Sequence, residues 1–174
     1  ESIAATTTGS TLLLDEAFTL AAFRELLRGE RYDIVHIASH GMFGDSVDTS
    51  FIMAHDELLR LDDMPSVLAG GRPRGGAIDL ITLSACRTAE GDDRAPLGMS
   101  GVAIKARAGS ALGTLWPVSD LAADRVMTRF YALLAGGAHS KAEALRIAQL
   151  ELIDAEELPQ PFFLAPFVLV GDWQ

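Results

Sequence analysis

Three short, largely apolar runs most constrain the fold of this chain. They are Ile34–Ser39, Ile78–Ser84 and Ser110–Leu115, and the first two are rich in β-branched residues. Runs of this length that are apolar at successive positions are typical of strands buried on both faces, whereas strands at a solvent-facing sheet alternate apolar and polar residues. A sheet of such strands needs helices on both of its faces.

Segments with helical patterns separate these runs. Thr19 can cap a helix that ends near Gly29, and Asp120–Leu134 carries an apolar stripe at helical spacing. Ser140–Glu143 is a capping box that opens a further helix through about Leu152. Strands that alternate with helices in this way predict an α/β fold with a mostly parallel, helix-covered sheet.

The remaining segments predict smaller elements. We expect a short strand at Thr11–Leu14, a hairpin or irregular excursion at Phe51–Leu61, and a final strand at Phe167–Val170. Pro65–Gly76 predicts a short helix followed by a loop, and Gly98–Ala108 has the composition of a helix.

Composition limits the classes of function. The chain of 174 residues is 49% hydrophobic and 22% charged, which suits one domain, residues 1–174, with a buried core. A net charge of −10 argues against non-specific binding to nucleic acid and against docking on anionic lipid. We find neither a membrane-spanning apolar stretch nor a secretory signal, and the single cysteine cannot form an internal disulfide. These features predict a cytoplasmic protein without a metal or another cofactor.

Two reactive residues follow two of the predicted strands. Ligands bind beyond the carboxyl ends of the strands in an open α/β sheet, and His40 and Cys86 come at those ends. If the strands are neighbours, their ends lie about 5 Å apart, or about 10 Å with one strand between them. Histidine can act as a general base toward a cysteine nucleophile. The backbone N–H groups of Gly41 and Cys86 would then face the developing oxyanion.

Each of these residues also has a structural interpretation. A lone cysteine in an apolar setting is usually an inert core residue, and a lone histidine at a strand end is an equally weak indication of catalysis. The pair at equivalent strand ends favours catalysis more than either residue does. We expect His36, inside its strand, to be a buried, hydrogen-bonded side chain, and His55 and His139 to be solvated.

Several segments together resemble a known family. Ile34–Gly41 and Leu83–Gly91 resemble the two signature segments of the CHAT domain, a caspase-like, separase-related cysteine peptidase module often fused to tetratricopeptide repeats. The resemblance continues through Leu115–Asp120, Ala144–Gln149 and Ala165–Asp172, in the order that the family has. It covers nearly the whole chain from about residue 12.

The resemblance implies a caspase-like three-layer α/β/α sandwich and a catalytic dyad of His40 and Cys86. These residues are 46 positions apart, close to the roughly 50 of caspases. It implies a cysteine endopeptidase that cleaves a protein partner under the control of an attached repeat module or an activator. Ser84 and Thr88 replace the caspase Gln and Gly, so caspase specificity for aspartate is not implied. Family domains usually have a further strand and helix upstream of Thr11, so we expect that this chain lacks its N-terminal elements.

The resemblance also suggests a substrate pocket, formed by Ser84, Trp116, Ser119 and Asp120. An acidic pocket floor at Asp120 would suit a lysine or arginine side chain, whereas the alternative is that Asp120 only caps the following helix. The alternative function for the whole chain is a catalytically silent interaction module. A cysteine phosphatase is excluded, because its loop needs an arginine six residues after the cysteine and position 92 is an aspartate.

Overall fold

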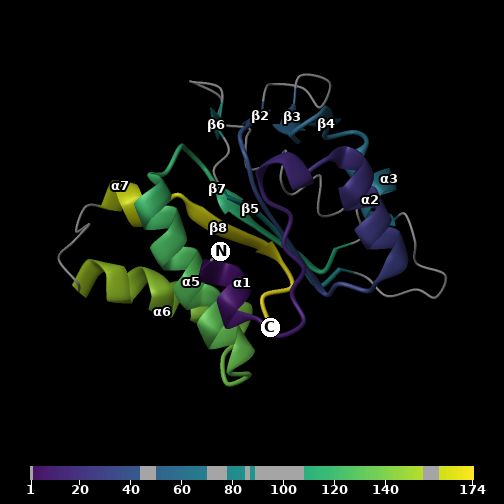
Figure 1. Ribbon diagram of the computed structural model, residues 1–174. Coiled ribbons are helices and arrows are strands. Elements are labelled where there is room, and N and C mark those ends of the chain that lie inside the picture. Colours follow the sequence, from purple (N-terminus) through teal and green to yellow (C-terminus); the bar gives the residue numbers. More distant parts are fainter. Residues whose placement is uncertain (1, 44–49, 70–77, 85–86, 89–107, 155–160) are drawn as a thin grey trace.

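The core of the fold is a four-stranded sheet in the order β1-β5-β7-β8. The computed structural model describes residues 2–43, 50–69, 78–84, 87–88, 108–154 and 161–174 (Figure 1). The strands are β1 (Ile34–Ala38), β5 (Leu80–Ser84), β7 (Ser110–Thr114) and β8 (Phe167–Gly171). The first three are parallel and β8 is antiparallel to β7, so the sheet is mostly parallel, as the sequence predicts.

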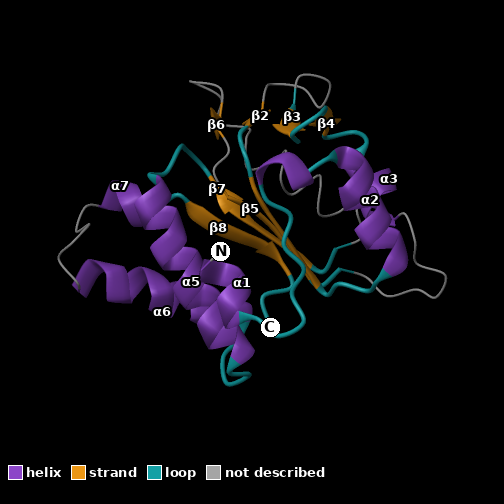
Figure 2. Ribbon diagram, in the orientation of Figure 1, coloured by secondary structure: helices purple, strands orange, loops and turns teal. Residues whose placement is uncertain are grey.

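Helices cover both faces of this sheet (Figure 2). One face packs against α2 (Leu20–Gly29) and α3 (Met64–Ala69). The other packs against α5 (Asp120–Ala135) and α6 (Lys141–Asp154), and the short helices α1 (Ser2–Thr6) and α7 (Pro161–Leu164) lie on that side too. The predicted three-layer α/β/α arrangement is therefore confirmed.

The central strands explain why their sequences are apolar throughout. Every residue of β5 and β7 is buried. Within β5, Ile81 and Leu83 belong to the apolar cluster of α2 and α3, whereas Leu80 belongs to the cluster of α5 and α6. Successive side chains therefore enter opposite layers, and neither face leaves room for a solvated residue.

A second, smaller sheet lies beyond the carboxyl ends of β1 and β5 (Figure 1). Its order is β4-β3-β2-β6. The strands are β2 (Gly41–Phe43), β3 (Phe51–Met53), β4 (Leu58–Arg60) and β6 (Arg87–Thr88). The antiparallel β3–β4 pair confirms the hairpin predicted within Phe51–Leu61. Strand β2 follows β1 closely along the chain and β6 follows β5, so the small sheet extends the region where the main strands end.

The turn of the β3–β4 hairpin is fixed to the start of α2. The backbone N–H of Leu20 donates a hydrogen bond to the Asp56 carboxylate at 2.9 Å, and the N–H of His55 donates to the carbonyl of Phe18 at 2.8 Å. Free N–H groups at a helix start need such acceptors. These bonds anchor the small sheet to the helix layer beside it.

Helix starts follow the sequence signals, with one correction. The Thr19 hydroxyl accepts a hydrogen bond from the N–H of Ala22, as expected of a cap. Ser140 and Glu143 form the predicted capping box. The cap of α5 is Ser119, whose hydroxyl accepts from the N–H of Ala122 at 3.3 Å, and Asp120 is the first helical residue. The interpretation of Asp120 as the cap was wrong, because the residue before it takes that position.

The strand predicted at Thr11–Leu14 does not form. This segment has no regular secondary structure, and Leu12 and Leu14 are 47% and 42% exposed. Apolar side chains that stay in solvent give a strand pairing little support. The helix predicted at Gly98–Ala108 lies outside the described residues, apart from Ala108. None of the described helices has both the length and the apolar character needed to span a bilayer.

Replacing Gly41 should separate two strands of the small sheet. A Cβ atom at Gly41 would lie 2.7 Å from the carbonyl oxygen of Phe51, so the backbones of β2 and β3 would have to move apart. We expect Gly41→Ala to lower the free energy of unfolding by about 1–3 kcal/mol, measured by urea denaturation.

The matched control is Gly29→Ala at the end of α2. A Cβ atom there would meet nothing within 4 Å. This substitution should be neutral, or stabilise by up to about 1 kcal/mol, because alanine favours helix more than glycine does. Equal effects of the two substitutions would contradict the close contact at Gly41.

Candidate active site

The two strands that lead to the predicted site residues are neighbours. Strands β1 and β5 pair in parallel, with Ala38 opposite Ser84. The shorter of the two predicted spacings is therefore confirmed for these strand ends, about 5 Å. His40 comes two residues after Ala38, and its side chain is exposed. Cys86 comes two residues after Ser84 and lies outside the described residues.

The chain pairs again beyond these positions. In the small sheet, Met42 of β2 lies opposite Arg87 of β6, and these strands are also parallel. The two chain segments are therefore paired as parallel strands on both sides of the predicted site residues, by β1 and β5 before them and by β2 and β6 after them.

The peptide bond between His40 and Gly41 has a fixed orientation. The N–H of Met53 donates to the His40 carbonyl at 2.8 Å, and the Ser39 hydroxyl donates to the Met53 carbonyl at 2.5 Å. The described peptide bonds are all trans, so the N–H of Gly41 points opposite to the His40 carbonyl. It therefore points away from β3, toward the edge of β2 that pairs with β6.

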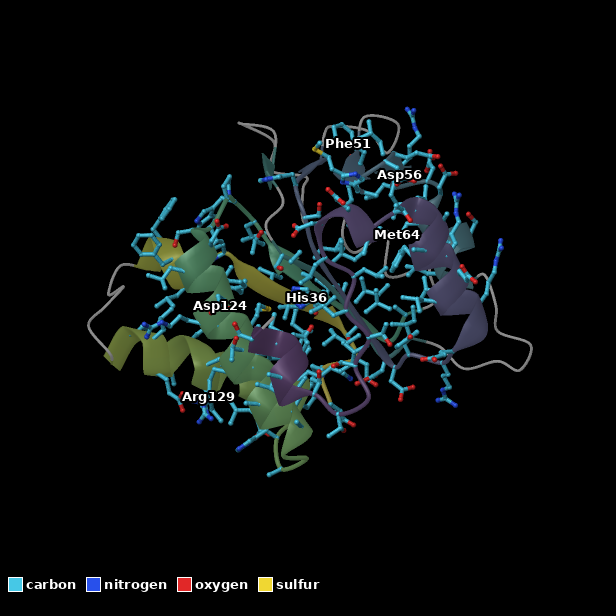
Figure 3. The ribbon with its side chains drawn as sticks, viewed as in Figure 1. His36, Phe51, Asp56, Met64, Asp124 and Arg129 are labelled. Carbon is cyan, nitrogen blue, oxygen red and sulfur yellow. The ribbon has the colours of Figure 1, made fainter. Side chains whose placement is uncertain are left out.

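A hydrogen-bonded group of four side chains lies between the main sheet and α5, around His36 (Figure 3). His36 Nε2 is 2.7 Å from the Ser84 hydroxyl, and His36 Nδ1 is 3.0 Å from the Tyr131 hydroxyl. The Tyr131 hydroxyl donates to Thr82 Oγ1 at 2.7 Å. The expectation that His36 is hydrogen-bonded is confirmed, and the residue is half-buried in β1. We call these four residues the His36 network.

The bonds of the network suit a neutral imidazole. A neutral ring donates from one nitrogen and accepts at the other, and each His36 nitrogen lies beside a hydroxyl that can do either. Both tautomers can therefore bond to Ser84 and Tyr131 at once. Burial lowers the pKa of His36 to about 4 and raises the pKa of Tyr131 above its ordinary value.

The four predicted pocket residues use their polar atoms differently. Ser84 is buried and bonded to His36, and Ser119 caps α5. The Trp116 indole N–H donates to the Phe162 carbonyl at 2.9 Å, and the two rings are 5.9 Å apart. Asp120 is exposed. No hydrogen bond between them joins Ser84, Trp116 and Ser119, so the pocket stays a prediction.

The remaining predictions concern the other histidines, a metal site and the partners of His36. His55 and His139 are exposed, as expected. Among the described residues, no group of three or more histidine, cysteine or acidic side chains could hold a metal ion. The absence of a metal or cofactor stays a prediction. Sequence reasoning missed Tyr131 and Thr82 as partners of His36.

The sequence also matches a family model. The model of the CHAT domain aligns with residues 1–172, which is nearly the whole chain. The match also includes α1 and the segment after it, which precede the motifs that carry the resemblance in the sequence. Among curated proteins, no significant match was found. The family assignment therefore rests on the agreement between the family model, the motifs and the fold.

His36 should make the protein less stable in mild acid. Its pKa is about 4 in the folded chain and 6.5 without burial, so the unfolded chain takes up a proton first as the pH falls. This contribution to stability is complete above about pH 6.5 and is lost toward pH 4. It amounts to about 3 kcal/mol. Urea denaturation between pH 7 and pH 4 measures the loss.

Two variants isolate this contribution. His36→Phe should lose less stability over the same pH range than the wild type, because no buried imidazole then titrates. His139→Phe, which replaces an exposed histidine, should lose as much as the wild type. A wild-type pH dependence in His36→Phe would contradict the assignment.

Proposed function

The chain belongs to the CHAT domain family of caspase-like peptidases, and from this membership we propose that it is a cysteine endopeptidase. Cys86 is the nucleophile and His40 is the general base. The substrate is a protein.

The pairing of the chain on both sides of the two residues carries the proposal. Ala38 and Ser84 are paired before them, and Met42 and Arg87 are paired after them. Successive Cα atoms are 3.8 Å apart and paired strands about 4.8 Å. The covalent chain therefore keeps Cys86 within one residue of a position paired with β2. This short separation along the chain supports a Cys86 thiol close enough for the His40 imidazole to reach it.

The chemistry then follows from the groups present. His40 accepts the thiol proton, and the thiolate attacks the carbonyl carbon of the scissile peptide. The carbonyl oxygen becomes an oxyanion, for which we assign the Gly41 N–H, on the edge of β2 that pairs with β6, as a donor. The imidazolium gives its proton to the departing amine. Water, activated by His40, then hydrolyses the thioester and restores the free thiol.

The exposed surface of the small sheet supports a protein substrate. Met53 and Leu58 lie opposite each other in β3 and β4, and both side chains are exposed. Met53 is also bonded through its backbone to His40. Apolar side chains beside the base suit an extended polypeptide, which can cover them. Control by an attached repeat module or an activator protein completes the proposal, and it derives from the family resemblance.

Labelling of Cys86 tests the dyad without requiring a known substrate. A thiol paired with histidine is ionised at lower pH than a free thiol of pKa about 8.5. At pH 6.5, iodoacetamide should therefore label the wild type at least about tenfold faster than His40→Ala. His139→Ala is the matched control and should label like the wild type.

Equal labelling of the wild type and His40→Ala would favour the silent interaction module. With a cleavable substrate, Cys86→Ala should abolish proteolysis. Its thermal transition should stay within a few degrees of the wild type, because only one sulfur atom is removed. Cleavage that persists in Cys86→Ala would exclude this nucleophile.

Asp120→Asn tests the acidic pocket floor. Because Ser119 supplies the helix cap and Asp120 is exposed, we expect a small and uniform effect on cleavage of a peptide library. If Asp120 instead holds a basic side chain in a closed pocket, cleavage after lysine or arginine should fall about a hundredfold. That selective loss would contradict the expectation and assign the pocket.

A further inference from the structure

We propose that His36 is a positioning residue for the candidate active site. Through the His36 network it holds Ser84, and with it the carboxyl end of β5, in a fixed place beside β1. This inference rests on the proposed function, since the chain after Ser84 leads to Cys86 and the chain after β1 leads to His40.

The network joins three elements in a closed ring. His36 of β1 lies opposite Thr82 of β5, and Ser84 is the next residue of β5 on the same face. His36 bonds forward to Ser84, Tyr131 bonds to His36 from α5, and Tyr131 bonds back to Thr82. A shift of β5 along β1, or of α5 over the sheet, would break at least one of these bonds.

The neighbouring strand carries a buried hydroxyl that has no such bond to a described residue. Thr114 of β7 follows Gly113, which pairs with Leu83, so it is on the same face as Ser84. It is 3% exposed, and its hydroxyl has no hydrogen-bond partner among the described residues. Within the described part of the chain, the hydroxyl that is bonded at this end of the sheet is thus that of Ser84 and not that of Thr114. Ser84, on the strand that leads to Cys86, is bonded.

Stability alone does not require a polar network at this place. Apolar groups of the same shape can replace a buried hydrogen-bonded pair with little change in stability. The polar network also fixes the alignment of β1 with β5, because its hydrogen bonds are all satisfied in only one alignment of the strands. Alignment matters for a dyad whose members follow different strands, since a displacement of about 1 Å can reduce a rate about a hundredfold.

The test compares rates of Cys86 alkylation by iodoacetamide from pH 5.5 to pH 9. This reagent is too small to depend on a substrate pocket. We expect His36→Phe and Ser84→Ala each to lower the rate at pH 6.5 by about fivefold or more, toward the rate of His40→Ala. The double variant should resemble the single ones, because both remove the same bond.

Two further variants separate positioning from packing. Thr114→Val removes the hydroxyl beside Ser84 and should leave the alkylation profile of the wild type unchanged. His36→Gln keeps one donor and one acceptor for the hydroxyls of Ser84 and Tyr131, and should restore most of the rate that His36→Phe loses. A change of thermal stability without a change of profile would show that His36 only packs the core.

The outcomes distinguish this inference from the proposed function. If His40→Ala slows alkylation but His36→Phe and Ser84→Ala do not, the positioning role is wrong and the dyad stands. If His40→Ala has no effect, the dyad is wrong and the positioning role falls with it. Should His36→Phe fail to fold, Ser84→Ala tests the same bond from its other end.

Discussion

The parallel ladder between β1 and β5 determines where the rest of the candidate site lies. Its register sets Ala38 opposite Ser84, so the strands end together and the chain leaves both of them on the same edge of the sheet. A slip of one residue would turn every side chain of β1 to the other face. His36 would then enter the apolar cluster of α2 and α3, where no hydroxyl of the network could reach it.

The two faces of the sheet contribute differently to the site. On the side of α2 and α3 the buried cluster is apolar, and burial there stabilises the sheet through contacts that have no preferred direction. On the side of α5, the His36 network adds bonds that hold in one alignment only. The small sheet then continues from the strand ends, and its bonds to residues 39 and 40 orient the Gly41 N–H.

Much of the fold was predictable because local signals agreed with the tertiary structure. Continuous apolar runs predicted the buried strands, and capping residues predicted where α2 and α6 begin. The cap of α5 was not decidable, since Ser119 and Asp120 are adjacent and both residue types cap helices well. Thr11–Leu14 has the composition of a strand, but Leu12 and Leu14 stay exposed among the described residues, and such side chains give strand pairing little support.

For the site, the sequence predicted that His40 and Cys86 follow strand ends on one edge of the sheet. It left open whether those strands are neighbours, and it did not predict the contacts that cross between elements. The close approach of Phe51 to Gly41 depends on how the hairpin folds back, which no local pattern records. One usable signal was present in β5. Thr82 and Ser84 are polar residues of equal parity in an otherwise apolar strand, so they had to share a face and find partners there. His36 has the matching parity in β1. The parity of these three residues therefore indicates a polar contact between β1 and β5. This contact explains why the Ser84 side chain is bonded within the core, although the chain after it leads to Cys86.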